Sequence, residues 1–243
     1  MPTETPRAFL DLQYHKAAQE YLRSLPPEHF MEATTQATQR AITLASLALV
    51  HADRPDVQVF NELLVQYPLR GQKRPGQVVP DNMVVVHGDP IRADGSFDVP
   101  LQPARPLLVL EYVSKNSERK DYQDNMDKYE HQLKVPYYLL FYPEIQELTL
   151  YRHTGKRYVS VKPNEHDRHA IPELDLEAAM LDGWVRYWYK KKLLPLPGEL
   201  KRELDATQRK LEASDQARLA AEDESARLRA ELEQLKKRRN NHG

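Results

Sequence analysis

The chain has 243 residues, 40% of them hydrophobic and 29% charged, which is enough for one good-sized domain and an appendage. It contains no cysteine, which excludes disulfides, thiolate nucleophiles and zinc sites built on sulfur, and which fits a cytoplasmic protein. Its formal net charge of −1 excludes a strong overall attraction for nucleic acid, so any such binding depends on local patches. The sequence shows neither a secretory signal nor an apolar run long enough for a membrane helix, so we expect no membrane contact.

The first two elements that the spacing predicts are helices. Apolar residues recur at helical spacing between Leu10 and Leu22, and Pro26-Pro27 ends that helix, so we expect residues 1–33 to form an N-terminal arm. Thr34 or Thr35 can cap a second helix that reaches about Val50. We expect this helix to bury one apolar face, made of Ala37, Ala41, Leu44, Ala45, Ala48 and Leu49.

Strands follow, with an acidic residue beside two of them. Residues 57–60 and 63–67 are strand-like, and a basic loop, 68–77, separates them from an apolar strand that Asp81 precedes. A long loop rich in proline, aspartate and glycine leads to a strand at 107–110, and Glu111 stands where that strand should end.

A charged helix and more strands complete the predicted domain. Over about 118–133 the apolar stripe is Tyr122, Met126, Tyr129 and Leu133, and a second, polar stripe is Asp121, Asn125 and Lys128. Strands are expected at 135–141, 148–152 and 156–161, followed by a closing unit at 171–194 with Gly183 in a turn. This order of helices and strands predicts an α/β domain over 34–195.

The C-terminal segment has a different composition. Pro195 to Gly198 form a boundary, and residues 199–239 contain no proline, glycine or aromatic residue. A 3-4 repeat runs through them, with flanking pairs of opposite sign at Lys210–Asp215, Glu224–Arg229 and Glu231–Lys236, as in a parallel two-stranded coil. We therefore expect a coiled-coil helix that joins two copies of the chain or binds another coiled-coil partner. The alternative is a lone, charged helix that frays.

Asp81 and Glu111 are the candidate site. Two carboxylates that converge from neighbouring strand ends can hold Mg²⁺ (or Mn²⁺), which polarises a phosphodiester oxygen and lowers the pKa of an attacking water. A lysine nearby, such as Lys128, can stabilise the charge that develops on the phosphate. The alternative is that these acidic residues are solvated or cap a turn or helix.

Several motifs in order resemble those of a known family. They are Pro80-Asp81, Glu111-Tyr112-Val113-Ser114, and Asp121 followed by Lys128-Tyr129; the apolar strand at 134–140 and the segment 171–189 also fit. Over about residues 30–195 the chain is similar to the Uma-two family, which comprises PD-(D/E)XK restriction-endonuclease-like proteins of bacteria.

The resemblance implies a restriction-endonuclease-like α/β core, a mixed sheet flanked by helices, with Asp81 and Glu111 as metal ligands. The E-x-K lysine of the superfamily falls at Val113, so the resemblance assigns its role to Lys128, with Lys115 as the alternative. A further acidic ligand before the second helix has two candidates, Glu28 and Glu32.

The implied function is a Mg²⁺-dependent DNA endonuclease that hydrolyses phosphodiester bonds through Asp81, Glu111 and Lys128. The loop residues Arg70, Lys73 and Arg74, together with Lys115, are the candidate nucleic-acid contacts. Two alternatives stay open: an inactive nuclease-fold module that acts as a scaffold through its coiled coil, and hydrolysis of RNA.

Two histidine pairs lack a ligand pattern. His15 with His29, and His166 with His169, have no carboxylate at fixed spacing on the same element, so we expect surface histidines.

Overall fold

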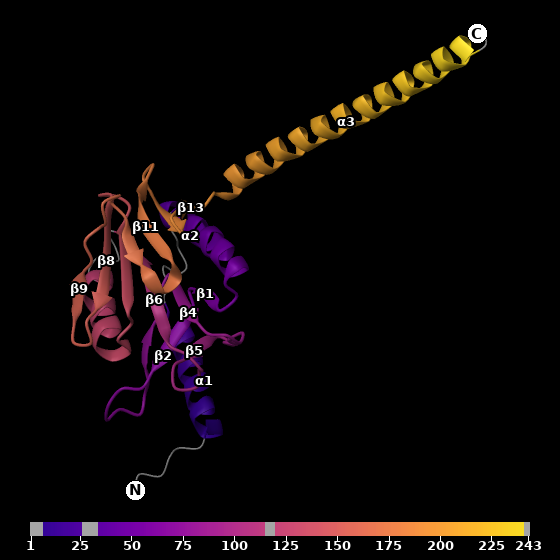
Figure 1. Ribbon diagram of the computed structural model, residues 1–243. Helices are drawn as coiled ribbons and strands as arrows, with labels where there is room; N and C mark the ends of the chain where they lie inside the picture. Colours follow the sequence, from indigo (N-terminus) through magenta and orange to yellow (C-terminus); the bar gives the residue numbers. More distant parts are fainter. Residues whose placement is uncertain (1–6, 26–33, 115–119, 241–243) are drawn as a thin grey trace. The chain divides into compact units, whose positions relative to one another are not determined.

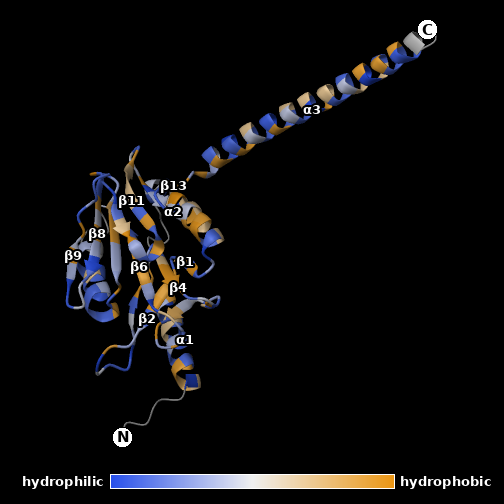
Figure 2. Ribbon diagram, in the orientation of Figure 1, coloured by the Kyte–Doolittle hydropathy of each residue, from blue (hydrophilic) through white to orange (hydrophobic). Residues whose placement is uncertain are grey.

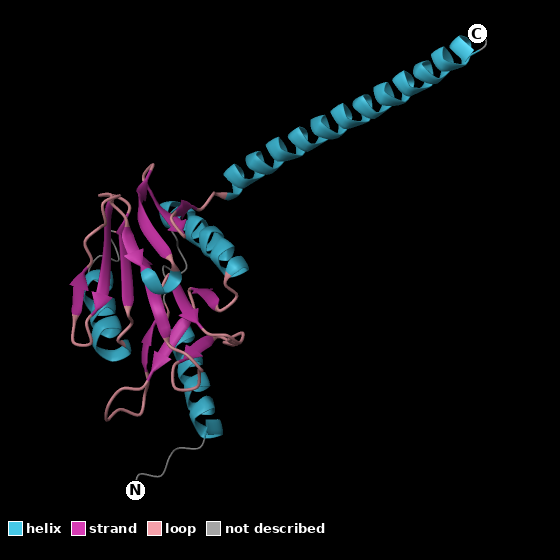
Figure 3. Cartoon of the chain, viewed as in Figure 1, coloured by secondary structure: helices cyan, strands magenta, loops and turns pink. Residues whose placement is uncertain are grey.

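The structure is a computed structural model and describes residues 7–25, 34–114 and 120–240. The chain forms two compact units, Met1–Leu194 and Pro195–Gly243. Figure 1 traces the elements and Figure 3 marks the helices and strands.

A six-stranded sheet is the centre of the first unit. Its order is β1-β4-β6-β7-β8-β9, and its neighbours are antiparallel except for the parallel pair β6–β7. The chain crosses from β6 to β7 through the helical segments η2 and η3, because parallel strands need a long connection. The strands are β1 (Val57–Asn61), β4 (Asn82–Val86), β6 (Pro106–Tyr112), β7 (Tyr137–Tyr142), β8 (Glu147–His153) and β9 (Tyr158–Ser160).

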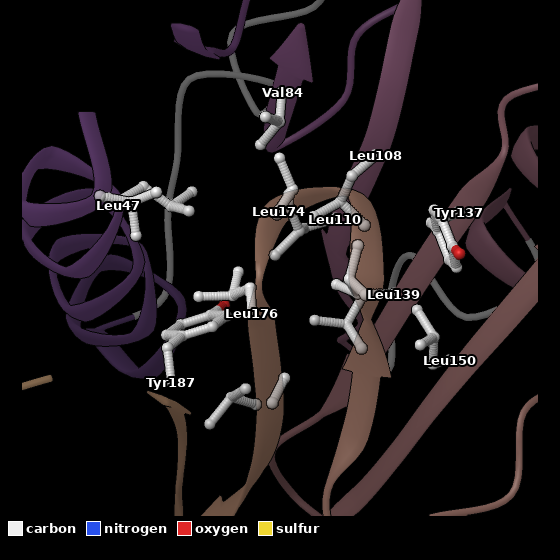
Figure 4. Packing of buried hydrophobic residues seen from close by; sticks show 14 of the residues in the cluster. Leu47, Val84, Leu108, Leu110, Tyr137, Leu139, Leu150, Leu174, Leu176 and Tyr187 are labelled. Atoms are coloured by element: carbon white, nitrogen blue, oxygen red, sulfur yellow. The ribbon is translucent and has the colours of Figure 1, made fainter. Parts of the chain in front are cut away.

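One face of this sheet is covered by helix α2 (Thr34–Asp53) and a four-stranded antiparallel sheet. The covering strands are β10 (His169–Ile171), β11 (Leu176–Leu181), β12 (Trp184–Tyr189) and β13 (Lys192–Leu193), with the short helix η4 (Pro172–Leu174) between β10 and β11. Figure 4 shows the packing, in which Leu47 of α2 and Tyr187 of β12 share one apolar cluster with Leu110 and Leu139 of the central sheet. Asp182 and Gly183 both have positive φ, 53° and 80°, so the β11–β12 connection has the predicted turn.

The opposite face carries a second cluster. A three-stranded sheet, β3 (Gly76–Val78), β2 (Leu64–Tyr67) and β5 (Ser96–Asp98), packs there with η2 (Lys120–Asn125) and η3 (Lys128–Leu133). Helix α1 (Arg7–Ser24) lies against β2 and β5 and buries Tyr14 and Ala18. Val113, at the position of the superfamily lysine, is fully buried in this cluster.

The prediction for the buried face of α2 is wrong. Ala37, Ala41 and Ala48 are exposed, whereas the buried residues are Gln39, Ile42, Thr43, Ser46, Leu47 and Val50. Polar residues face inward because partners meet them there: Gln39 bonds both backbone groups of Val185, and Thr43 meets the hydroxyl of Tyr187 at 2.9 Å.

The prediction that His169 is a surface residue is also wrong, since its side chain is buried in β10 and bonds the carbonyl of Val161.

The second unit is a single long helix, α3 (Pro197–Asn240). Leucines are spaced along it, and their exposed fractions lie between 45% and 65%; Figure 2 shows the alternation of hydrophobic and hydrophilic residues. In the described part of the chain, no helix combines the length and the apolar character that crossing a bilayer requires. The coiled coil expected at 199–239 stays a prediction.

Candidate functional site

Asp81 and Glu111 lie side by side at the ends of β4 and β6. These strands are antiparallel with Asn82 opposite Leu110, so the next residues outward face each other. The backbone amide of Asp81 donates to Oε2 of Glu111 at 3.3 Å, and the amide of Tyr112 donates to Oδ2 of Asp81 at 2.6 Å. The structure therefore brings both predicted acidic residues into one place.

The Glu111 carboxylate is buried, with 2% of the residue exposed. Oε1 accepts hydrogen bonds from the amide of Asn125 at 3.0 Å and from the hydroxyl of Tyr129 at 2.7 Å. Burial, and then the nearby Glu111 carboxylate, raise the pKa of the Tyr129 hydroxyl well above its ordinary value, so this group stays a donor. Such donors offset the cost of taking a carboxylate out of water.

The helical crossover presents Asn125 and Tyr129 together. The segments η2 and η3 are π-helical, with hydrogen bonds to the fifth rather than the fourth residue, so each turn holds more residues than an α-helix. Residues four apart share a face in an α-helix and in a π-helix, so Asn125 and Tyr129 both reach Glu111. The sequence pattern predicts them in separate polar and apolar stripes, whereas the structure buries both side chains beside the Glu111 carboxylate.

Asp81 contacts a cation that the sequence did not reveal. Its side chain is 25% exposed, and Oδ1 lies 3.2 Å from Nη2 of Arg40 on α2. The other terminal nitrogen, Nη1, lies 2.8 Å from Oε1 of Glu62 in the connection between β1 and β2. The nearest sequence signal is the i, i+4, i+7 spacing of Gln36, Arg40 and Thr43, which puts them on one helix face.

A buried hydrogen-bond network also holds Tyr112, at the end of β6, to helix α2. The hydroxyl of Tyr112 donates to Thr43 at 2.8 Å and also meets Asn82, while Gln36 donates to the Tyr112 carbonyl at 2.7 Å. Burial raises the pKa of the Tyr112 hydroxyl well above its ordinary value, which keeps it protonated. Helix α2 thus fixes the strand that carries Glu111.

The arrangement offers hard oxygen donors from two rigid strand ends. Carboxylates of this kind are ligands for Mg²⁺ or Mn²⁺, and of the two only the Asp81 side chain is partly exposed to solvent.

The comparisons with known proteins agree with this architecture. The model of the Uma2 family, described as "Putative restriction endonuclease", matches residues 12–182. The chain belongs to the Uma2 family. The resemblance inferred from the motifs, and the mixed α/β fold, are thereby confirmed. No curated protein sequence matches the chain.

A solved structure is also similar to this Uma2 protein. It is titled a putative nuclease belonging to DUF820 from Anabaena variabilis, and the two chains share 14% identity with a TM-score of 0.45. The match covers 59% of this chain and 75% of the other.

The remaining predicted site residues are placed as follows. Lys128 is half-buried, one residue before Tyr129 in the crossover, while Lys115, Glu28 and Glu32 lie outside the described residues. Within the described ranges, no group of three or more histidine, cysteine or acidic side chains is placed to hold a metal ion. The carboxylate pair, joined by its hydrogen bonds across two strand ends, is the candidate centre of this Uma2 protein.

The basic loop lies at the far end of β2 from the site. Arg70, Lys73 and Arg74 are exposed between β2 and β3, and Nη2 of Arg74 is 3.7 Å from Oε2 of Glu20 on α1. The strand β2 begins two residues after Glu62, whose amide bonds the Asp81 carbonyl, so the loop lies at the end of β2 away from Asp81.

Proposed function

We propose that this Uma2 protein is a Mg²⁺- or Mn²⁺-dependent endonuclease that hydrolyses phosphodiester bonds of DNA in the bacterial cytoplasm. The observation that supports it most is the reciprocal bonding of Asp81 and Glu111 at adjacent strand ends. A family model described as a restriction endonuclease covers both residues.

Asp81 and Glu111 would hold the metal ion. When bound, the ion supplies a Lewis acid for a phosphodiester oxygen and lowers the pKa of a water. Glu111 is fixed by Asn125 and Tyr129, so its orientation is set before any ligand arrives. Asp81 is the more exposed of the two acids and faces solvent, from which substrate comes.

Lys128 is the proposed lysine of the site. It stands on the same crossover as the two residues that bond Glu111, and an ammonium group close to the carboxylates can stabilise negative charge on a phosphate. Lys115 is the alternative, because it follows the Glu111 strand in the sequence.

DNA would contact the loop of Arg70, Lys73 and Arg74. The loop is exposed and carries three cations, and duplex DNA presents one phosphate charge per about 1.7 Å of axis, so the two attract each other. The loop would position the duplex without reading its sequence.

Helix α3 would join two copies of the chain as a parallel coiled coil. In that register, leucine meets leucine at Leu200, Leu204, Leu211, Leu228, Leu232 and Leu235, all of them exposed in the single chain. Lys210–Asp215, Glu224–Arg229 and Glu231–Lys236 then pair across chains with opposite sign. An antiparallel arrangement would instead place Lys201 against Lys236 and Asp215 against Glu222. A dimer would supply one site for each strand of a duplex.

The test is cleavage of supercoiled plasmid with Mg²⁺ or Mn²⁺ by the wild type, Asp81→Asn and Glu111→Gln. Both variants should lose about 100-fold or more of the activity, because each removes one ligand charge while keeping the side-chain shape. Equal cleavage by all three proteins would remove the assignment. An RNA substrate run beside the plasmid separates the two nucleic acids.

A second candidate function is a binding or scaffold module without catalysis. Two observations favour it: Val113 fills the position of the superfamily lysine, and the groups that donate to Oε1 of Glu111 are an amide and a protonated hydroxyl. Calorimetry separates the two candidates, because an inactive module should bind Mg²⁺ no better than Glu111→Gln does.

A further inference from the structure

Arg40 bridges two carboxylates at the edge of the candidate site. Its side chain is 13% exposed, and its terminal nitrogens lie 3.2 Å from Oδ1 of Asp81 and 2.8 Å from Oε1 of Glu62. A guanidinium group held by both ends has a fixed position, unlike a surface cation on a flexible stem.

Glu62 binds the Arg40 nitrogen that does not contact Asp81. Its φ of 47° is in the left-handed region, which a non-glycine residue adopts only when its surroundings stabilise it. The Glu62 amide donates to the backbone carbonyl of Asp81 at 3.2 Å, while its carboxylate binds Arg40. Backbone and side chain thus close a ring of three residues: Asp81, Glu62 and Arg40.

Helix α2 fixes the base of the Arg40 side chain. Gln36, one turn before it, bonds the carbonyl of Tyr112, and Thr43, one turn after it, bonds the Tyr112 hydroxyl. Arg40 is therefore anchored on both sides along the helix, and its guanidinium is delivered to Asp81 rather than to solvent.

A cation in this place has two opposite effects on the chemistry proposed for the site. It lowers the affinity of the carboxylate pair for a divalent cation, because like charges repel. It also attracts a phosphate group, whose oxygens a guanidinium can bind in a bidentate manner. The strand position that could have supplied a cation, Val113, is apolar and fully buried.

We propose that Arg40 binds the phosphodiester group undergoing cleavage, with Glu62 holding the guanidinium in place. This inference rests on the proposed function and adds a phosphate-binding residue to it. Once the charge of Asp81 is shared with a metal ion, Nη2 of Arg40 binds a phosphate oxygen while Nη1 stays on Glu62. No covalent bond to Arg40 forms.

Calorimetric titration of Mg²⁺ into the full chain tests the electrostatic half of this proposal. Arg40→Gln should bind Mg²⁺ about tenfold more tightly, because a repelling charge is removed. Glu62→Gln should bind it about threefold more weakly, because the positive charge of Arg40 is then less compensated. Tighter binding by Arg40→Gln together with weaker binding by Glu62→Gln supports the proposal, and any other pair of shifts would overturn it.

Binding of a short fluorescent DNA duplex in Ca²⁺ tests the other half without depending on cleavage. Arg40→Gln should bind the duplex about tenfold more weakly while binding metal more tightly. Arg40→Lys keeps the charge but not the paired donors of the guanidinium, so its affinity for the duplex should lie between those of the wild type and Arg40→Gln. Loss of both affinities would indicate a structural role and overturn the proposal. Circular dichroism confirms folding, and if Arg40→Gln does not fold, Arg40→Lys and Glu62→Gln give the same comparison.

The experiment also separates this proposal from the proposed function. A wild type that binds no Mg²⁺ would remove the metal site, and the role of Arg40 with it. A wild type that binds Mg²⁺, with Arg40→Gln binding it no more tightly, would remove the role of Arg40 alone.

Discussion

The amide of Tyr112 donates a hydrogen bond of 2.6 Å to Oδ2 of Asp81, and the amide of Asp81 donates to the carboxylate of Glu111, the residue before Tyr112. Each strand end thus binds the acidic residue of the other. The two carboxylates are part of the pairing between β4 and β6 as well as candidates for chemistry.

The exchange predicts different stabilities for two substitutions of Asp81. Asp81→Asn keeps an oxygen acceptor for the Tyr112 amide, while Asp81→Ala leaves this amide in a largely buried place without that partner. Both remove the repulsion between the two carboxylates equally. We therefore expect the free energy of unfolding of Asp81→Ala to be about 1–2 kcal/mol lower than that of Asp81→Asn, measured by urea denaturation. Equal stabilities would show that this hydrogen bond contributes little.

The buried hydroxyl of Tyr112 predicts an energetic coupling between α2 and β6. Tyr112→Phe removes its bonds to Thr43 and Asn82, and should lower the free energy of unfolding by about 1–2 kcal/mol. In a double-mutant cycle with Thr43→Val, the coupling should be about 1 kcal/mol, because the two hydroxyls share one bond. Additive effects would contradict direct contact.

His169 predicts a dependence of stability on pH. Burial lowers its pKa below the ordinary value, so below about pH 6.5 the unfolded chain takes up a proton that the folded chain resists. This contribution lowers the free energy of unfolding as the pH falls, until the folded pKa is passed. His169→Gln should show a smaller loss between pH 7.5 and 5.5 than the wild type, while His166→Gln, at an exposed position, should follow the wild type. Parallel curves for all three would exclude the effect.

Arg218 is expected to weaken the proposed coiled-coil dimer. In the parallel register it occupies the seam, where it would face its own copy, and in the single chain it lies 3.6 Å from Asp215 and 3.7 Å from Glu222. Arg218→Leu should tighten the dimer at least about tenfold, measured by analytical ultracentrifugation, because apolar contact replaces a charge in the seam. Arg227→Leu is the matched control, since residue 227 lies outside the seam and should leave the dissociation constant unchanged. Equal effects of the two would contradict this register.

Local patterns in the sequence predict most of the strands but not the polar interior. The strands near Asp81 and Glu111 follow from apolar runs, one beginning just after Asp81 and the other reaching Glu111. The inner face of α2 does not follow, because Gln39 and Thr43 meet partners 146 and 144 residues away, at Val185 and Tyr187. Nothing within a helical window identifies such partners.

Part of the candidate site could likewise be predicted from local patterns. Asp81 and Glu111 each stand at a strand end, and the family resemblance implies that both belong to one metal site. Arg40 and Glu62 could not be predicted, because their contacts depend on how α2 and the β1–β2 connection lie against β4. Asn125 and Tyr129 share a helix face through their i, i+4 spacing, but their bonds to Glu111 depend on how the crossover lies against β6.

The parallel pairing of β6 with β7 has a consequence for how the protein folds. These two central strands can pair only after the crossover between them has closed, which is a loop with an entropic cost that neighbouring hairpins avoid. The same crossover brings the donors that accompany Glu111 into the interior. We therefore expect the sheet to be completed, and the donors to reach the Glu111 carboxylate, in the same step of folding.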